Sequence, residues 1–453
     1  MASITKKILE GAFLTSTQKI LTIVLGAFGA ILVLQALGTR QYGFVVLAVS
    51  IINIFNVFLD LGIGNVVVSD IAGDSGENNL KRIKKLIHDY FGFQITAGII
   101  LSLIVFVFSF FSQKYYGSEI ASLVRIASVI IFLNGLRNVL ITVFYGFSKF
   151  GFLALFYFLE SLAKFLAVFF LIVIFNGGMV SVMLTYLLSP FFAIIIMLPF
   201  YFAARLPLRN IEAVKENALF DLIKTHGKFQ ILARPLHNTL DPFRYWIIQY
   251  FAGVEAVAVF QVALKFFGYL SQIVFSIETP LLSVVSEELR RDKQIVKKLF
   301  ERISKYFTWI AVLSMIISFI LTPIFFHMFF QEKYDASIPL IYWFLFSFVI
   351  GGVSVLMRPL LFALKAQKEL LKADFLSAII TYPFASYLTY LYGPVGFAIP
   401  IGAYLTFIFR FRYLKKIEPI FVINFYSFFK WDKEDYFLIK RIFCGFINKI
   451  YKT

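Results

Sequence analysis

Apolar runs of about 20 residues recur along the whole chain, and each is long enough to cross a hydrocarbon layer of roughly 30 Å as a helix. Hydrophobic residues make up 60% of the 453 residues and charged residues only 15%, whereas soluble domains have ~45–50% and ~25%. The strands of a transmembrane barrel would instead alternate in hydropathy over ~10 residues. The sequence therefore predicts an all-α, polytopic membrane protein.

The positions of these runs predict twelve membrane spans. They lie at residues 11–37, 42–66, 86–112, 118–145, 150–175, 179–203, 226–251, 254–286, 303–330, 336–364, 369–391 and 394–414. Lysine and arginine gather in alternate loops, which the positive-inside rule places on the cytoplasmic side. The remaining loops contain only Arg40, Lys114 and Lys333. We therefore expect a protein of the cytoplasmic membrane with both termini in the cytoplasm.

A weak internal repeat divides the chain. LGTRQYGFVVLA at residues 37–48 aligns with AGVEAVAVFQVA at 252–263, and each leads into a long apolar helix and then a basic loop. Six spans in each half make the repeat parallel, an arrangement that favours a substrate site between the halves and rocking of one half against the other. We predict an N-terminal lobe at 1–203, a cytoplasmic linker at 204–225, a C-terminal lobe at 226–418 and a basic amphipathic cytoplasmic tail at 419–453.

Polar stripes run along the first two predicted spans of each half. Charged side chains inside a membrane are costly, so they usually face a bundle interior or an aqueous cavity. We interpret the stripes as a cationic, water-filled cavity that binds substrate through Lys19, Arg234, Arg244 and Lys265. Arg137 of the fourth span is a further candidate for substrate binding. The acidic candidates for coupling to H⁺ or Na⁺ are Asp60, Asp241 and Glu278. The alternative is that the polar groups only form hydrogen bonds between packed helices.

Other charged and sulfur-containing residues point to structural roles or to none. Glu160 and Lys164 are four residues apart in the fifth span, which predicts a structural ion pair on one helix face. The histidines and the single cysteine, Cys444, lack metal-ligand spacing, and no ATP-binding motif occurs, so we expect no metal and no organic cofactor. The net charge of +17 lies in short loops without a nucleic-acid-binding motif. The tail is expected to contact membrane lipids instead.

One block of sequence suggests a family. LGTRQYGFVVLAVSIINIFNVFLDLGIGNVVVSDIA at residues 37–72 resembles the first-hairpin signature of bacterial polysaccharide transporters, the O-antigen (Wzx-type) flippases of the multidrug, oligosaccharidyl-lipid and polysaccharide exporter superfamily. In that pattern a short LG…YG turn precedes a helix that ends in aspartate-leucine-glycine, here Asp60-Leu61-Gly62. The segment at 240–265 resembles the opening of the second half. The family often has an arginine soon after this turn, whereas Ser69 and Asp70 stand here, so no role of that arginine is carried over.

The resemblance implies a V-shaped, two-lobed exporter with a central cavity, like that of multidrug and toxin exporters. Such a protein is not an enzyme. It would flip an undecaprenyl-diphosphate-linked oligosaccharide, such as an O-antigen or capsule repeat unit, to the outer leaflet by alternating access, driven by a proton or sodium gradient. A polysaccharide polymerase and a chain-length regulator are the implied protein partners. A cationic cavity suits this substrate, because lysine and arginine pair with phosphate oxygens.

Two other functions stay open. A cation-coupled multidrug exporter would share the fold, although its often cationic substrates would prefer an acidic cavity. A polytopic polysaccharide polymerase or ligase would need catalytic groups on an exposed loop, and the predicted outward loops are short.

Overall fold

The computed structural model describes residues 2–212, 218–222, 228–275, 285, 288–289, 292–364 and 366–421. Within these ranges, the described side chains exclude those of residues 2–17, 76, 115, 221–222, 228–239, 270, 272–275, 350 and 351. Helices joined by turns and short irregular segments make up the described backbone, and no strand occurs in it. The predicted all-α fold class is therefore confirmed.

The first half of the chain forms a series of long helices joined by short turns. They are α1 (Ala2–Ala36), α2 (Thr39–Asp60), α3 (Ile63–Gly76), α4 (Leu80–Gly146), α5 (Phe150–Val168) with its π-helical extension η1 (Phe169–Ile174), α6 (Met179–Ala204), η2 (Leu206–Leu208) and the short α7 (Ala218–Leu222). Helix α4 contains two candidate membrane spans, Leu80–Lys114 and Tyr116–Gly146, and near their junction Gly117 adopts a non-helical φ of 86° that kinks the helix.

The second half continues in the same manner. Its described elements are α8 (Lys228–Ala252), α9 (Val254–Phe275), α11 (Lys293–Phe330), η4 (Asp335–Ser337), α12 (Ile338–Ala363), α13 (Gln367–Tyr392), α14 (Val395–Ala398), α15 (Ile401–Ile417) and η5 (Pro419–Phe421). Prolines lie inside α6, α11, α12 and α13.

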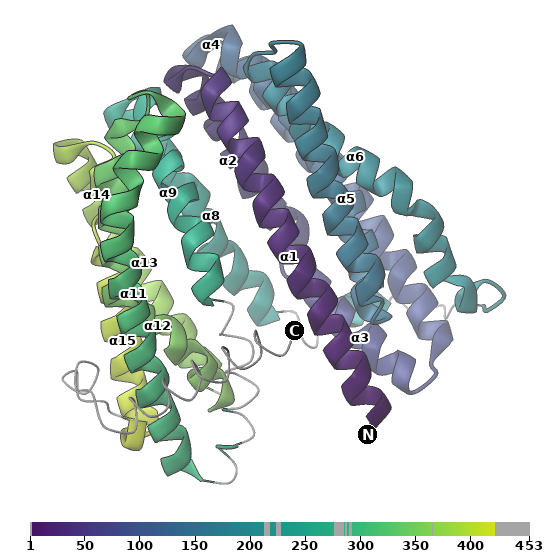
Figure 1. Cartoon of the computed structure of the whole chain (residues 1–453). Coiled ribbons are helices and arrows are strands. Elements are labelled where there is room, and N and C mark those ends of the chain that lie inside the picture. The colour runs from purple at the N-terminus through teal and green to yellow at the C-terminus, as the bar shows by residue number, and fades with distance from the viewer. Residues whose placement is uncertain are drawn as a thin grey trace, which may run out of the picture. The chain divides into compact units, whose positions relative to one another are not determined.

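The chain divides into two compact units. The first contains the described residues of 1–269, 321–341 and 382–398, and the second contains those of 270–320, 342–381 and 399–453. In the first unit α1 packs against α5, α5 against α6, and α4 against α2, α3 and α6 (Figure 1). Its core is built around fully buried aromatic residues such as Tyr90, Phe144 and Phe156.

Helix α8 lies in the first unit because it packs against α2. Trp246 donates its indole N–H to the Ser50 hydroxyl at 2.9 Å. Gly43 lies against the backbone carbonyl of Val254, so the starts of α2 and α9, which the internal repeat relates, meet each other. The units therefore do not divide at 204–225, and the predicted lobes, linker and tail stay a prediction.

The predicted second span, 42–66, is too long at its end. Helix α2 stops at Asp60, because Leu61 and Gly62 adopt φ angles of 47° and 75°, and α3 begins at Ile63. The Asp60 carboxylate accepts the backbone N–H of Gly64 at 3.2 Å, which satisfies one of the free donors of the first turn of α3. Gly64 permits this approach, since a Cβ there would meet the Asp60 carboxylate. The aspartate-leucine-glycine motif is thus a helix stop followed by a helix start.

Eight described helices or helix segments are long and apolar enough to cross a membrane, and a bent pair over 335–349 and 352–363 makes a ninth. The remaining predicted spans, 226–251, 254–286 and 369–391, contain α8, α9 and α13, which do not pass the same test over the described residues. In α8 the cause is its polar content, with Asn238, Asp241 and Arg244 in one helix. The count of twelve stays a prediction.

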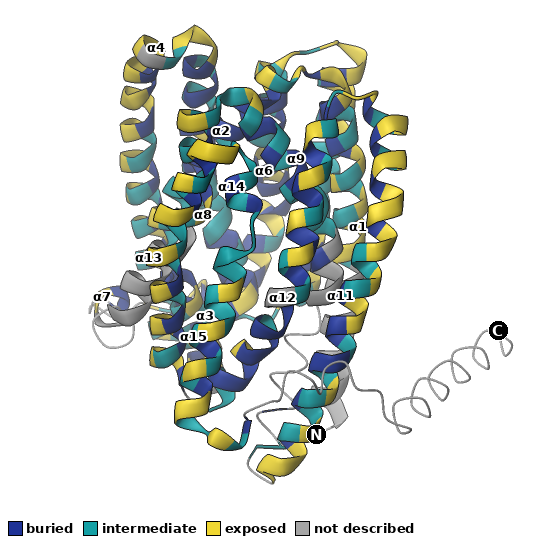
Figure 2. Ribbon diagram, turned by 90° about the vertical axis from the view of Figure 1, so that its left-hand side faces the viewer, coloured by how far each residue is buried: buried dark blue, intermediate teal, exposed yellow. Residues whose placement is uncertain are grey.

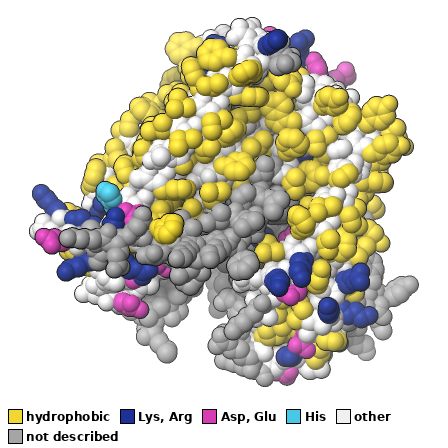
Figure 3. Space-filling model, turned by 180° about the vertical axis from the view of Figure 1, so that it is seen from behind, with side chains coloured by type: hydrophobic (Ala, Val, Ile, Leu, Met, Phe, Trp, Pro, Cys, Tyr) yellow, Lys and Arg dark blue, Asp and Glu magenta, His cyan; other side chains and the backbone are white. Residues whose placement is uncertain are grey.

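Large hydrophobic side chains cover the outward helix faces. Residues along α4 such as Leu103 and Phe111 are 57% and 61% exposed, and along α11 Phe319 and Ile324 are 61% and 60% exposed. Figure 2 shows exposed and buried residues on opposite faces of the same helices, and Figure 3 shows hydrophobic side chains over much of the surface. Exposed apolar surface on this scale is suited to lipid rather than to water. The chain is therefore a multi-pass membrane protein.

The close approach at Gly43 predicts how α2 responds to a methyl group. Gly43→Ala would place a Cβ against the backbone of Val254, which cannot rotate away. Overpacking costs about 1–3 kcal/mol, which exceeds the gain in helix propensity of about 1 kcal/mol. We expect a lower melting temperature for the detergent-purified protein. Gly73→Ala in α3 is the control, since its Cβ would meet no atom within 4 Å, and equal melting temperatures for both variants would contradict the account.

Candidate functional site

A basic and aromatic cluster lies inside the first unit, where α5, α6 and α9 each contribute a polar side chain. The Lys164 ammonium of α5 lies over the ring of Tyr186 of α6, 3.4 Å from the ring centroid. Lys265 of α9 interacts electrostatically with both Tyr186 and Lys164. All three side chains are half-buried, so each retains part of its exposed surface. We call Lys164, Tyr186 and Lys265 the lysine pair site.

Among the described residues, neither lysine of this site has an acidic counterpart. Over the ranges that the structure describes, Lys164 and Lys265 form no ion pair with a carboxylate. Two ammonium groups that are near each other and partly removed from water repel each other more strongly than they would in bulk solvent. An anion between them would relieve this repulsion.

Further tyrosines surround the lysine pair site. Tyr42 of α2 lies near Tyr186, Tyr245, Tyr269 and Tyr334. The Tyr245 hydroxyl of α8 donates to the side chain of Gln261. Gly26 of α1 leaves room for the Tyr269 hydroxyl, which would lie 3.7 Å from a Cβ at that position. Phenol groups combine an apolar ring face with a hydrogen-bonding hydroxyl, a combination that suits sugars as well as phosphate oxygens.

The predicted ion pair between Glu160 and Lys164 is replaced by a different one. The Glu160 carboxylate accepts two hydrogen bonds from the guanidinium of Arg137 on α4, at 2.8 and 3.0 Å. A two-bond contact between arginine and a carboxylate is stronger than a single contact with an ammonium group. Arg137 also lies over the rings of Phe156 and Tyr157. Glu160 is thereby engaged by Arg137, and no described carboxylate forms an ion pair with Lys164.

Arg244 and Asp241, which were assigned to substrate binding and ion coupling, pair with each other along α8. The Arg244 guanidinium donates to the Asp241 carboxylate and also, at 2.7 Å, to the Asp241 backbone carbonyl. The Tyr382 hydroxyl of α13 donates to the same carboxylate at 3.4 Å. The two opposite charges therefore compensate each other in the described structure.

The other predicted site residues lie apart from the lysine pair site or outside the described part. Lys19 is exposed on α1, and Asp60 caps α3. The side chain of Arg234 and the whole of Glu278 lie outside the described residues. Of the predicted cations, Lys265 is the one that the structure places in this cluster. The roles in substrate binding and ion coupling stay predictions.

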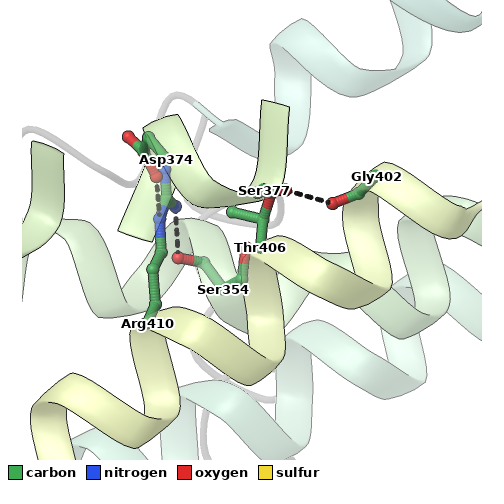
Figure 4. A network of polar contacts seen from close by, with 6 residues as sticks. All are labelled: Ser354, Asp374, Ser377, Gly402, Thr406 and Arg410. Atoms are coloured by element: carbon green, nitrogen blue, oxygen red, sulfur yellow. Dashed lines mark hydrogen bonds and ion pairs between the residues drawn. The ribbon is translucent and has the colours of Figure 1, made fainter. Parts of the chain in front are cut away.

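An ion pair in the second unit was missed in the sequence. Arg410 of α15 donates two hydrogen bonds to the Asp374 carboxylate of α13, at 2.9 and 3.2 Å, and a third to the Ser354 carbonyl of α12 at 2.7 Å (Figure 4). One turn further along α13, the Ser377 hydroxyl contacts the Thr406 hydroxyl at 2.8 Å and donates to the Gly402 carbonyl. The signal was available, since consecutive predicted spans contain an aspartate and an arginine.

No group of three or more metal-ligating side chains occurs in the part of the chain that the structure describes. The polar groups of the first unit instead combine cations, hydroxyls and aromatic rings. Such a set can bind an anionic or sugar-bearing molecule by charge-assisted hydrogen bonds and ring contacts.

The Asp374–Arg410 pair predicts a specific pattern of stabilities. Arg410 is only 7% exposed, so Asp374→Asn should leave a buried charge uncompensated and destabilise the fold by about 3–5 kcal/mol. Asp374→Leu combined with Arg410→Met should lose much less, because no charge remains. Thermal unfolding of the detergent-purified variants measures both. A double variant as unstable as the single one would mean that the pair does not act by charge compensation.

Several solved structures with the same arrangement of helices are transporters. A lipid II flippase, MurJ, in an inward closed conformation matches with a TM-score of 0.70 and 14% identity over 97% of this chain and 98% of that chain. A multidrug resistance transporter of the MATE family, in the MOP superfamily, matches in its inward-facing form with a TM-score of 0.65 and 15% identity over 88% and 95% of the two chains. An outward-facing form matches with a TM-score of 0.61 and 15% identity over 92% and 97%.

The sequence itself gives one family match. Comparison with curated proteins finds no significant match. The family described as polysaccharide biosynthesis protein matches residues 35–339, which is more than half of the chain. The resemblance noted in the segment at 37–72 falls within this match. The chain therefore belongs to the polysaccharide biosynthesis protein family, and it has the fold of MOP-superfamily transporters.

Proposed function

We propose that this protein is a flippase that moves a lipid-linked oligosaccharide with a diphosphate head group across the cytoplasmic membrane by alternating access. Membership of a polysaccharide biosynthesis family and a transporter fold support a lipid-linked substrate. The observation that carries the proposal is the lysine pair site, where two half-buried ammonium groups lie near Tyr186 and lack a carboxylate partner among the described residues.

The charge of this site discriminates between the candidate substrates. A diphosphate would accept hydrogen bonds from both ammonium groups, and these charge-assisted bonds are stronger than bonds between neutral groups. A cationic drug would instead be repelled by Lys164 and Lys265. Glu160, one turn before Lys164 on α5, is already paired with Arg137, and Asp241 on α8 is paired with Arg244. The site therefore favours the flippase over a multidrug exporter of the same fold.

The other parts of the proposal concern its energy source, partners and orientation. A proton or sodium gradient would drive the cycle, with Asp60, Asp241 and Glu278 as the acidic candidates. A polymerase and a chain-length regulator would act on the flipped substrate. Both termini would lie in the cytoplasm, so the basic end of α4 near Arg82 would face inward and the break at Gly117 outward. The protein would act as a secondary transporter rather than as an enzyme.

Replacement of the lysine pair tests the proposal in cells. In a strain that lacks the wild-type gene, Lys164→Gln combined with Lys265→Gln should lower surface polysaccharide by about tenfold or more, because each lost charged hydrogen bond costs roughly 1.5–3 kcal/mol. Lys114→Gln is the control, since Lys114 is an exposed lysine that pairs with no other described residue. Surface polysaccharide is measured by immunoblot, and membrane levels of each variant by fluorescence of a fused reporter. Normal export by the double variant would refute the assignment of the site.

A binding measurement separates the flippase from the exporter. Undecaprenyl diphosphate should raise the melting temperature of the purified protein, as a ligand at ~100 times its Kd adds about 2.7 kcal/mol of stability. Undecaprenol, which lacks phosphate, should not, and the double lysine variant should lose the response. Stabilisation by ethidium in place of the diphosphate, together with drug sensitivity of the deletion strain, would favour the multidrug exporter.

A further inference from the structure

The turn between α11 and α12 lies on the C-terminal end of α1, although about 300 residues separate them. The Lys333 ammonium donates to the backbone carbonyls of Leu34 and Gln35 at 3.1 and 3.2 Å. Helix α1 ends at Ala36, so these carbonyls are among the last four, which have no partner inside the helix. A positive charge at this place also compensates the partial negative charge of the helix C-terminus. Lys333 therefore acts as a cap for α1.

The contact is reciprocal. The Gln35 side-chain amide donates to the Phe329 carbonyl at 3.1 Å, and Phe329 lies in the last turn of α11, which ends at Phe330. Each helix end thus supplies a donor for the free carbonyls of the other. The pairing joins the two halves of the internal repeat, because α1 belongs to the first half and α11 to the second.

Tyr334 fixes the same turn against α2. Its ring is fully buried and meets the ring of Tyr42 edge to face, with centroids 6.4 Å apart, and that of Phe330 at 5.6 Å. The Ser337 hydroxyl, three residues on, donates to the Val259 carbonyl of α9 at 2.9 Å. The turn is therefore held by both halves of the repeat within one compact unit. We call Gln35, Tyr42, Phe329, Lys333 and Tyr334 the α1 latch.

Two buried polar groups at this turn destabilise the closed latch. The Tyr334 hydroxyl is buried without a hydrogen-bond partner among the described residues, and so is one carboxylate oxygen of Asp335. An unsatisfied buried polar group loses its hydration without compensation. Burial lowers the pKa of Lys333 and raises that of Tyr334, which agrees with partial loss of water at both groups. Opening would return water to these atoms.

We propose that the α1 latch is a releasable gate: Lys333 holds the ends of α1 and α11 together, while the unsatisfied Tyr334 hydroxyl keeps the closed state only marginally favoured. Release would let the first helices of the N-terminal half move away from the α11–α12 turn, on the side predicted to face outward. Lys333 is one of three basic residues predicted on that side, and the cap that it provides explains its presence there. The gate acts without substrate, so its test is independent of what the protein transports.

Distance measurements between two spin labels test the gate. The background is Cys444→Ser with Arg40→Cys at the start of α2 and Ala336→Cys in the α11–α12 turn, both exposed positions outside the latch. Pulsed electron–electron double resonance on this protein in lipid nanodiscs, without substrate, gives the populations of short and long distances between the two labels. Lys333→Met should increase the long-distance population, since it removes the cap but keeps the apolar stem. Tyr334→Phe should lower the ratio of long to short distances by about fivefold or more, because it removes the unsatisfied hydroxyl.

Control variants separate the gate from general effects of substitution. Lys333→Arg retains a donor with a positive charge and should remain closer to the background than Lys333→Met does. Lys114→Met removes an exposed lysine at the break in α4 and should leave the distances unchanged. An unchanged distribution in Lys333→Met, or a larger long-distance population in Tyr334→Phe, would overturn the proposal. The opposite shifts in the two latch variants cannot arise from misfolding, which would change both in the same direction.

Discussion

A charge enclosed by helices in a membrane is stable only with a counter-charge or a polar partner, and this requirement organises the molecule. Each described unit contains an arginine with two hydrogen bonds to a carboxylate on a neighbouring helix. These are Arg137 with Glu160 in the first unit and Arg410 with Asp374 in the second. Arg244 and Asp241 satisfy each other within α8. Lys164 and Lys265 differ from these arginines because neither has a carboxylate partner among the residues that the structure describes.

The lack of a described carboxylate partner makes the lysine pair site suitable for a transporter of anions. A substrate must bind firmly enough to be selected and still be released, so a site with a permanent internal counter-ion would compete with an anionic substrate. Arg137 pairs with Glu160, so the Lys164 ammonium group remains available to an anionic substrate. Tyr186 partly compensates through its ring, since cation–π contacts are weaker than a buried ion pair. The site is thus stable when empty and more stable with an anion.

Close backbone contacts give the first unit its other defining feature. Gly43 lets the start of α2 meet the start of α9, and the α1 latch joins the ends of α1 and α11. Both contacts connect segments that the internal repeat places in different halves. A transporter that alternates between two states needs contacts of this kind that can break, and the unsatisfied groups at Tyr334 and Asp335 lower the cost of breaking them.

The features that could be predicted are those with a strong period or length signal. The long apolar runs predicted most helices, and the segment at 37–72 predicted the family, because both depend on local sequence. The end of α2 was misplaced, since the hydropathy of Leu61 and Ile63 continues through a turn that only the left-handed backbone at Leu61 and Gly62 reveals.

Which side chains pair with each other was harder to predict than where the helices lie. Glu160 and Lys164 have the right spacing for a pair, but Arg137 on another helix makes the stronger contact, and helical geometry alone contains no information on neighbouring helices. The contacts of Lys333 with α1 were inaccessible for the same reason, since they join segments about 300 residues apart.

The most direct test of the central claim is the structure of the purified protein in nanodiscs with bound undecaprenyl diphosphate, determined by electron cryo-microscopy. The account predicts density for the diphosphate within hydrogen-bonding distance of the Lys164 and Lys265 ammonium groups, beside the ring of Tyr186. Density for the head group at a different place, or a carboxylate bound to either lysine, would contradict it.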